Sequence, residues 1–255
     1  MSENVLTSLE GGVLTVRMQR PEKKNALTAA MYTALAGAID QAADDRTVRV
    51  VVIAGVEGAF TAGNDLDDFL NHPPRDADAP VHRFVTALAT TEVPLVAAVD
   101  GLAVGIGTTL LLHCEQVLAT ERSRFSLPFV NLGLVPENGS SMLLAQSCGY
   151  RKAAELLMLG EPFTAADALA CGIVSRLVPP AELESEAQAL ARKLAAKPRG
   201  ALRATKRLMR RPAEPLDVRI AAESKQFALF LDSPEAKEAF TAFLEKRAPD
   251  FTQFD

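Results

Sequence analysis

The sequence has 255 residues, of which 48% are hydrophobic and 23% charged, so it can bury a sizeable core and lacks the composition of a disordered chain. Its formal net charge of -5 excludes a general electrostatic attraction to nucleic acids or acidic membranes. The most apolar stretch, residues 93–112, is interrupted by Asp100, glycines and prolines, which leaves too short a run for a membrane helix. The first residues have no basic segment before an apolar core, so no signal peptide is expected.

The cysteines and histidines are scattered along the chain. Cys114, Cys148 and Cys171 include no CxxC pair, and this usage predicts reduced, mostly buried thiols and a cytoplasmic protein. The histidines form neither HExxH nor a Cys/His ligand pattern, so no metal site is expected. His113 follows three leucines and is expected to be a hydrogen-bonded structural histidine.

The chain begins with a predicted β-hairpin followed by a helix. Residues 5–10 and 13–19 alternate apolar and polar side chains, carry β-branched residues and flank a Gly-Gly pair, which is the pattern of a hairpin. Apolar residues at helical spacing predict a helix over residues 27–45. Thr28 is its expected N-cap.

Strands and helices are predicted to alternate in the middle of the chain. Continuous apolar runs at residues 48–55 and 94–101 predict buried strands. Residues 107–114 are predicted to form a helix, and residues 115–120 and 124–128 two further strands. This alternation is typical of an α/β core.

The composition changes after Pro179. Residues 182–246 are rich in Ala, Leu, Glu and Lys, and prolines divide the segment into amphipathic helices. Such helices can pack on the core or form a subunit interface. We therefore divide the chain into a core of residues 1–195 and a C-terminal helical region of residues 196–255, with oligomerisation as the expected role of the second part.

Two glycine-containing turns follow apolar strands, at residues 58–66 and 100–110. Small residues let a ligand approach the backbone, and free N–H groups of such turns can face a negatively charged atom. Neither turn has the GxGxxG or GxxxxGK[ST] spacing of nucleotide-phosphate loops, and the chain has no GxSxG elbow around residues 139–141. The turns fit either ordinary connections or the two donors of an oxyanion hole.

Four stretches spread over nearly the whole chain form a recognisable set. They are RPEKKNAL at residues 20–27, AFTAGNDL at 59–66, DGLAVGIG at 100–107 and AFLEKRAPDF at 242–251. In this order they resemble the crotonase, or enoyl-CoA hydratase/isomerase, superfamily. The resemblance implies an α/β fold built as a spiral of ββα units, an acyl-CoA thioester ligand, and a homotrimer or dimer of trimers. It implies no separate cofactor, because CoA is part of the substrate.

The resemblance also assigns site residues. The backbone N–H groups of Asn64 and Ile106 match the oxyanion-hole donors of the family. CoA contacts, mostly from the main chain, fall in the loop after Arg20, in the AGNDL turn and on a C-terminal helix that often belongs to a neighbouring subunit. Ordinary solvated charge is an equally good interpretation of the lysines among them. The matching positions are Lys23, Lys24, Ala26, Ala62, Gly63, Asp65, Leu66, Phe243 and Lys246.

Departures from the family pattern reduce the number of reactions that the chain can be expected to catalyse. Hydratases of the family use two glutamates, and the matching positions here are Thr109 and Phe129. One carboxylate remains nearby, Glu137 in LGLVPENGSS. Together with AGNDL and the HPP at residues 72–74, this stretch resembles the monofunctional, peroxisomal-type Δ3,Δ2-enoyl-CoA isomerases of fatty-acid β-oxidation. Their single glutamate takes a proton from C2 and returns it to C4, without water, metal or redox cofactor.

Glu137 also has a simpler interpretation as a glutamate at a helix start beside Pro136, stabilised by the helix dipole. The dipole lowers the pKa of a carboxyl group and an apolar pocket raises it, and the sequence does not decide between them. The isomerase is therefore favoured over two alternatives, a hydratase or other crotonase-family enzyme and a non-catalytic acyl-CoA-binding protein. Phe84 and Phe129 can line an acyl pocket, although core packing is the more usual role.

Overall fold

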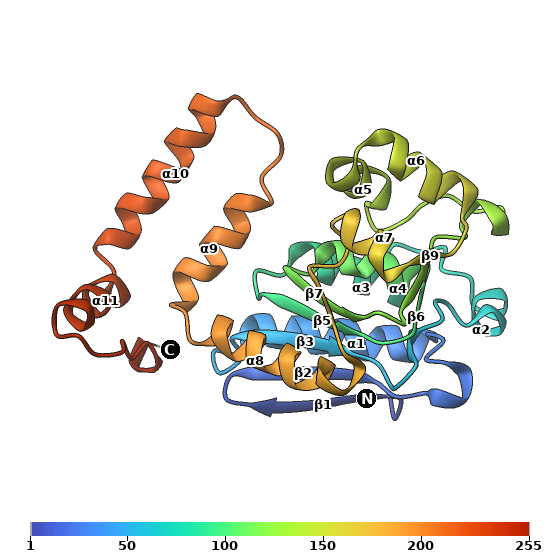
Figure 1. The fold of residues 1–255 in the computed structure, drawn as a ribbon, viewed down its shortest axis with the longest axis horizontal. Coiled ribbons are helices and arrows are strands. Elements are labelled where there is room, and N and C mark those ends of the chain that lie inside the picture. The colour runs from blue at the N-terminus through green and yellow to red at the C-terminus, as the bar shows by residue number, and fades with distance from the viewer. Residues whose placement is uncertain (1, 255) are drawn as a thin grey trace.

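Two sheets and the helices around them fill most of the molecule, as the computed structural model of residues 2–254 shows (Figure 1). The large sheet has the order β1-β2-β3-β5-β7-β10 and the small sheet β4-β6-β8-β9. The strands of the large sheet are β1 (Val5–Glu10), β2 (Val13–Met18), β3 (Val50–Ala54), β5 (Leu95–Val99), β7 (Gln116–Thr120) and β10 (Arg176–Val178). Those of the small sheet are β4 (Ala59–Thr61), β6 (Leu102–Val104), β8 (Arg124–Ser126) and β9 (Phe163–Thr164).

The helices follow the strands along the chain. They are α1 (Ala29–Asp44), α2 (Leu66–Asn71), α3 (Pro80–Thr90), α4 (Ile106–Thr109), α5 (Ser140–Cys148), α6 (Tyr150–Leu159), α7 (Ala165–Ala170), α8 (Leu183–Ala195), α9 (Arg199–Met209), α10 (Leu216–Leu231) and α11 (Pro234–Leu244). Short 3₁₀ helices span Pro21–Lys23, Leu110–His113, Val130–Leu132, Pro180–Glu182 and Thr252–Phe254. None of the described helices has the length and apolarity needed to span a membrane.

Successive strands alternate between the two sheets, which gives the spiral its form. β3, β5 and β7 pair in parallel in the large sheet, whereas β4, β6 and β8, each the next strand along the chain, pair in parallel in the small one. Helices then connect one strand pair to the next. The predicted α/β fold with repeated ββα units is therefore confirmed.

The N-terminal predictions are also confirmed. β1 and β2 pair antiparallel, and the Gly-Gly pair between them has positive φ angles at both positions, as the tightest hairpin turns require. α1 follows, and the Thr28 side chain accepts a hydrogen bond from the Met31 N–H at 3.3 Å, so Thr28 is the N-cap.

One prediction for the middle of the chain is wrong, and another is right only in part. β4 and β6 lie within the segments that we interpreted as turns, because a strand of three residues is too short to display an alternating pattern. The predicted helix over residues 107–114 is instead the four-residue α4 followed by the 3₁₀ helix Leu110–His113. α4 is short, yet it carries several of the residues considered below.

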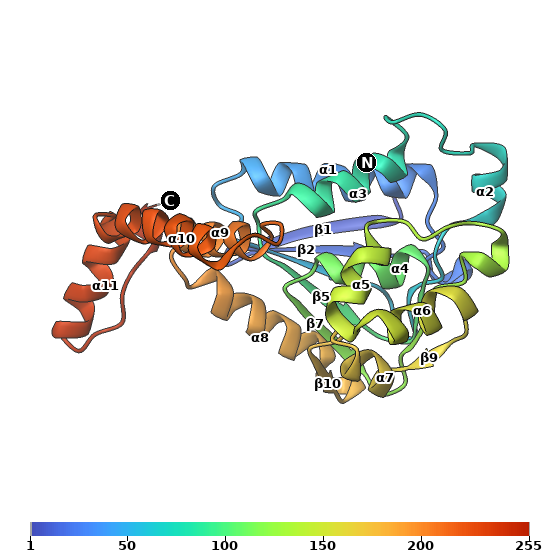
Figure 2. The same cartoon turned by 90° about the horizontal axis from the view of Figure 1, so that it is seen from above.

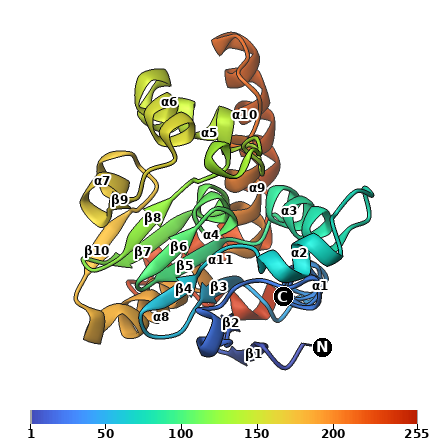
Figure 3. The same ribbon diagram turned by 90° about the vertical axis from the view of Figure 1, so that its right-hand side faces the viewer.

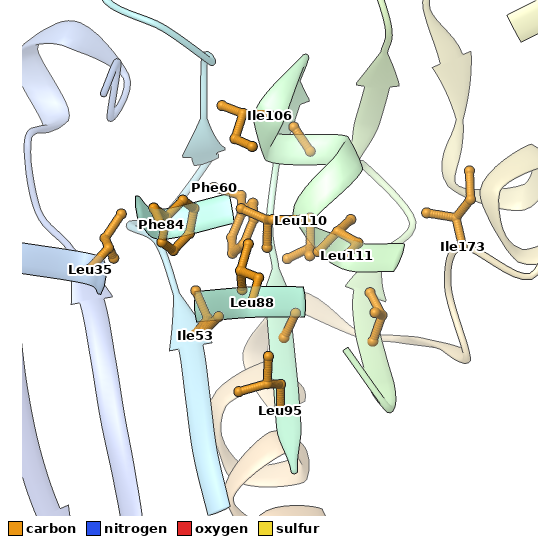
Figure 4. Close-up of a cluster of buried hydrophobic side chains, with 14 of the residues drawn as sticks. Leu35, Ile53, Phe60, Phe84, Leu88, Leu95, Ile106, Leu110, Leu111 and Ile173 are labelled. Atoms are coloured by element: carbon orange, nitrogen blue, oxygen red, sulfur yellow. The ribbon is translucent and has the colours of Figure 1, made fainter. Parts of the chain in front are cut away.

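The central strands of the large sheet, β3 and β5, are buried on both faces, as their continuous apolar sequences require. Val51 and Ile53 of β3 join the core under α1 and α3, and Val50 and Val52 face the opposite core, which α8 covers. Figure 4 shows Ile53 below Phe84 and Leu88 of α3. This double covering holds the carboxyl ends of the strands, and the turns that leave them, in fixed positions.

The last three helices, α9 to α11, form an arm that extends away from the sheets (Figures 1 and 2). None of the side chains of α10 is buried in the chain by itself, and several large apolar ones on α10 and α11 are exposed. α8, in contrast, packs on the sheet. Oligomerisation through residues 196–255 stays a prediction.

A buried charge cluster fastens the arm to the core. Lys206 of α9 is only 4% exposed, and its ammonium group donates to the Val93 carbonyl at 2.6 Å and pairs with Glu115 at 2.9 Å. Arg210 pairs with the other oxygen of Glu115 at 3.3 Å. Burial lowers the pKa of Lys206 to about 8 in spite of the Glu115 charge. The pair therefore depends on both partners being present.

We predict that Lys206→Ala lowers the free energy of unfolding by about 2–4 kcal/mol, because the buried side chain leaves a cavity and Glu115 keeps only Arg210 as a cationic partner. Urea denaturation monitored by circular dichroism measures this change. Lys193→Ala, at an exposed position of α8, is the control and should stay within about 0.5 kcal/mol of the wild type. Equal stabilities of the two variants would contradict this account of the arm.

Candidate active site

The two glycine turns meet at one point of the molecule. Gly63, which follows β4, has a φ of +87°, and a Cβ added there would lie 2.9 Å from the Val104 carbonyl oxygen at the end of β6. A Cβ added at Gly107 would lie 2.5 Å from a methyl group of Thr61. Only glycine allows these approaches, so the backbone around Asn64 and the start of α4 are neighbours.

The backbone of these turns leaves two N–H groups free. The Leu27 N–H donates to the Gly63 carbonyl at 2.8 Å and the Asp65 N–H to the Leu27 carbonyl at 2.9 Å, so the Asn64 N–H between them points to the other side of the segment. Ile106 is the first residue of α4, where an N–H has no acceptor within the helix. Within residues 2–254, neither the Asn64 nor the Ile106 N–H has a hydrogen-bond partner.

A cleft of about 610 Å³ lies over these groups. The rim loop after Arg20, the turn after β4 and the start of α4 form one side, and Phe129, Leu132 and Leu134 form an apolar side. Figure 3 shows α4 above the strands, between α3 and the helices α6 and α7. The predicted site residues that line the cleft are Lys23, Ala26, Ala62, Gly63, Asn64, Asp65, Leu66 and Ile106.

Three other predicted CoA-binding residues are not brought to this cleft. Lys24 adopts a left-handed backbone with a φ of 49°, and its carbonyl accepts the Ala62 N–H at 2.9 Å. α11 lies at the opposite end of the molecule from α2 (Figures 1 and 2); this helix includes Phe243, and Lys246 follows it. In the single chain these two side chains are exposed and remote from the cleft.

Arg20 shapes the rim of the cleft, which the sequence interpretation did not assign to it. Its guanidinium donates to Asp65 at 2.6 Å and to the Ala26 carbonyl at 2.8 Å. The hydrogen bond from Arg20 holds the pKa of Asp65 below its ordinary value, and the same carboxylate caps α2 by accepting the Asp68 N–H. The Asp65 side chain is therefore committed to the protein, and only the main chain there remains for a ligand.

Glu137 lies outside the first turn of α5, where helix-dipole effects are concentrated. The N-cap of α5 is Gly139, and the Glu137 carbonyl accepts the Ser140 N–H at 3.0 Å. Its side chain turns toward α4, where Oε1 accepts a hydrogen bond from the Thr109 hydroxyl at 2.5 Å. Glu137 is not among the residues that line the cleft itself, and it stands beside the cleft through its contact with α4.

Burial decides the pKa of Glu137. Desolvation raises the pKa of this carboxyl group to about 7, and the hydrogen bond from Thr109 opposes the rise only in part. A pKa near neutrality is typical of a carboxylate that can both accept and return a proton. The question that the sequence left open between the dipole and the apolar surroundings is thus answered in favour of burial.

Tyr32 of α1 completes the surroundings of Glu137 and had no signal in the sequence beyond its helical spacing. It is 3% exposed, and its hydroxyl donates to the Asn64 side-chain oxygen at 2.5 Å. Burial raises the pKa of Tyr32 well above its ordinary value, and the nearby charge of Glu137 raises it further. Its ring packs on Phe84, 5.7 Å away between centroids, so Phe84 belongs to the core, whereas Phe129 is both buried and part of the cleft wall.

The expectation of a structural His113 is confirmed. Its Nε2 lies 3.0 Å from the Asn138 carbonyl, and burial lowers the pKa of the imidazole, so the neutral ring donates to this carbonyl. This hydrogen bond holds Asn138, the residue after Glu137. Asn138 has a left-handed backbone with a φ of 55°. No group of three or more metal-binding side chains occurs within the described residues, and the three cysteines there are free.

Comparison with protein families matches residues 8–254 to the model described as enoyl-CoA hydratase/isomerase. The chain belongs to this family. Its fold agrees with a solved structure titled a putative enoyl-CoA hydratase/carnithine racemase from Magnetospirillum magneticum, which is 50% identical and has a TM-score of 0.96 over 99% of this chain and 100% of that one. The family and the crotonase-type fold implied by the sequence motifs are therefore confirmed.

Curated relatives carry both hydratase and isomerase names. The 2,3-dehydroadipyl-CoA hydratase of Escherichia coli is 35% identical over 98% of this chain and 99% of its own. Enoyl-CoA delta isomerase 2 of Rattus norvegicus is 35% identical over 82% of this chain and 55% of its own. The comparisons thus support an acyl-CoA enzyme of the hydratase/isomerase type, and they do not select one of the two reactions.

We predict that Gly63→Ala destabilises the protein more than Gly58→Ala does. Both glycines have positive φ, which costs alanine about 1–2 kcal/mol, but only at Gly63 does the new methyl group meet a backbone oxygen. The overlap should add about 1–3 kcal/mol. Thermal and urea unfolding of the two variants measure the difference, and equal losses would show that the two turns do not approach as closely as described.

Proposed function

We propose that this protein is a Δ3,Δ2-enoyl-CoA isomerase in which Glu137 is the only acid-base group. The observation that carries the proposal is the partly buried carboxylate of Glu137 beside α4, with a pKa raised to about 7 by desolvation, together with Thr109 and Phe129 at the positions of the two hydratase glutamates. The ionised carboxylate takes a proton from C2 of a 3-enoyl-CoA and returns it to C4. The double bond thereby moves into conjugation with the thioester.

The oxyanion hole stabilises the intermediate of this reaction. Removal of the C2 proton places negative charge on the thioester oxygen, which accepts hydrogen bonds from the Asn64 and Ile106 N–H groups. Support comes from the two unpartnered N–H groups at the wall of one cleft. Donors of this kind are each worth on the order of 10²–10³ in rate, because they are fixed before the charge develops.

The walls of the cleft bind the CoA part of the ligand. The main chain of the rim loop and of the AGNDL turn binds CoA, and Lys23 at the rim complements a phosphate. A second cavity of about 250 Å³ adjoins the cleft at Asp65 and Phe69 and has a mixed lining, with apolar Pro73 and Pro80 beside charged Asp68 and Arg75.

The alternative reaction is hydration of a 2-enoyl-CoA, which the hydratase names of some relatives favour. Water addition requires one group to activate water and another to deliver a proton, and family hydratases divide these roles between two carboxylates. Glu137 is the single carboxylate beside α4 that the sequence motifs retain. A hydratase would therefore have to use Glu137 for both steps.

We predict that Glu137→Gln lowers the rate of isomerisation of 3-hexenoyl-CoA by about 10²–10⁴, since the amide cannot accept the proton. The assay follows conjugation of the thioester by absorbance. Glu121→Gln, at an exposed position, is the matched control and should keep full activity. Equal activity of Glu137→Gln and wild type would overturn the assignment.

Two further outcomes of the same assay select the alternatives. Faster water addition to crotonyl-CoA than isomerisation of 3-hexenoyl-CoA would identify a hydratase. Binding of acyl-CoA without turnover across chain lengths would identify a binding protein.

We also propose that the protein is a homotrimer or a dimer of trimers in which α11 of one subunit approaches the cleft of another. The exposure of Phe243 supports this, because the side chain is 81% exposed and is not part of the cleft of its own chain. Exposed apolar side chains on α10 and α11, including Phe227 and Phe240, supply further surface for a second copy. Lys246 would then reach CoA from the neighbouring subunit.

We predict that the wild type sediments at three or six times the monomer mass, and that Phe243→Ser weakens acyl-CoA binding by at least about fivefold because an aromatic contact at the interface is lost. Analytical ultracentrifugation and calorimetric titration measure the two quantities. Lys237→Ser on the exposed face of α11 should change neither. A monomer with full affinity for acyl-CoA would contradict the proposed assembly.

A further inference from the structure

One short helix touches both halves of the candidate site. α4 begins with Ile106, whose N–H is a proposed oxyanion donor, and ends with Thr109, whose hydroxyl donates to Oε1 of Glu137 at 2.5 Å. Residues three apart on a helix lie on the same face, so the donor and the hydroxyl are separated by one helical turn. Both residues are buried, which leaves little freedom for this spacing to change.

We propose that Thr109 is a positioning residue that holds Oε1 of Glu137 and leaves Oε2 as the oxygen that carries the proton. This inference rests on the proposed function of Glu137 as the base, and it goes beyond it by giving a role to the residue that occupies the position of a hydratase glutamate. Oε2 has no hydrogen-bond partner within residues 2–254.

Threonine suits this role because its hydroxyl direction is restricted. Its branched Cβ limits the side chain to few rotamers. The Thr109 hydroxyl also lies 3.5 Å from the Ile106 carbonyl, at the outer limit of a hydrogen bond along the same helix. With Oε1 held, the carboxylate need not rotate during the reaction. The C2–H bond breaks as an O–H bond forms at Oε2, and the electron pair moves onto the thioester oxygen. The O–H bond then breaks as the C3=C4 electrons take the proton to form the C4–H bond, and the charge on the thioester oxygen returns to form the C2=C3 double bond.

None of the charged and titratable groups described around Glu137 donates a hydrogen bond to its carboxylate in place of Thr109. Tyr32 of α1 lies within electrostatic reach, but its phenol is buried, stays neutral and donates to Asn64. His113, after α4, is a neutral imidazole that donates to the Asn138 carbonyl, and Arg210 of α9 donates to the carbonyl of His113. The hydroxyl of Thr109 is the group that favours the ionised form of Glu137, against the effect of burial.

The test compares pH profiles of kcat/KM for Thr109→Val, Thr109→Ser and Thr108→Val. The wild-type rate should rise with pH through the pKa of Glu137, about 7, because the base must be ionised. Thr109→Val removes the bond to the carboxylate, so the rise should move upward by roughly one pH unit or more. Thr109→Ser keeps the hydroxyl and should restore the wild-type profile, and KM should change little in either variant.

Thr108→Val is the matched control on the same helix. The Thr108 hydroxyl is buried and donates to the Ala103 and Ser126 carbonyls, so its loss should lower the melting temperature without moving the pH profile. A Thr109→Val profile that coincides with the wild type would overturn the positioning role. If Thr109→Val does not fold, Thr109→Ala takes its place in the same comparison.

A direct titration separates this inference from the proposed function. Carbon-13 NMR of labelled glutamate, with Glu137→Gln to assign the signal, gives the pKa of Glu137 without any substrate. An upward shift in Thr109→Val supports the contact even if the protein proves to catalyse another reaction, and an unchanged pKa refutes it. Full isomerase activity of Glu137→Gln refutes the proposed function instead.

Discussion

The contact between Gly63 and the Val104 carbonyl is the constraint on which the candidate site depends. It is possible because β4 and β6 pair in parallel in the small sheet and because glycine leaves room for the carbonyl. The contact brings the backbone of Asn64 to the start of α4, and α4 in turn carries Ile106 and Thr109. A site made largely of main-chain groups can thus be exact in geometry although few of its side chains contact a ligand.

The burial of Glu137 has a cost to stability that follows from its pKa. Folding raises this pKa from the usual value of 4.5 to about 7, so the folded state binds the proton more tightly than the unfolded state. The protonated carboxyl group therefore favours the folded state at acidic pH. This contribution to the free energy of unfolding is lost as the pH rises from 4.5 through 7. At neutral pH the hydrogen bond from Thr109 limits this loss. A carboxyl group kept in such surroundings is more typical of a functional site than of a structural one.

Local patterns in the sequence predicted local structure well and long-range contacts poorly. The Gly-Gly hairpin and the Thr28 cap depend on neighbours in the chain, so their residue types were informative. Tyr32 and Asn64 are 32 residues apart, and Thr109 and Glu137 are 28 residues apart, so nothing in either neighbourhood indicated these hydrogen bonds. The motif resemblance pointed to Asn64 and Ile106, whose N–H groups are unpartnered at the cleft, because it carries information about the fold that the spacing of apolar residues does not contain.

The lysines of the C-terminal helices also show that local patterns do not predict long-range contacts. Lys193 is exposed to solvent and Lys206 is buried against Glu115, although both lie in amphipathic helices.

The attachment of the arm is linked to the segment that holds Glu137. Arg210 of α9 pairs with Glu115 and also donates to the His113 carbonyl at 2.7 Å. His113 donates to the Asn138 carbonyl, one residue after Glu137. The short run from His113 to Glu115 therefore contacts both α9, from which α10 and α11 continue, and the backbone beside the proposed base. If α11 meets another subunit as proposed, assembly and the position of Glu137 share one anchor, and changes at Glu115 should affect both.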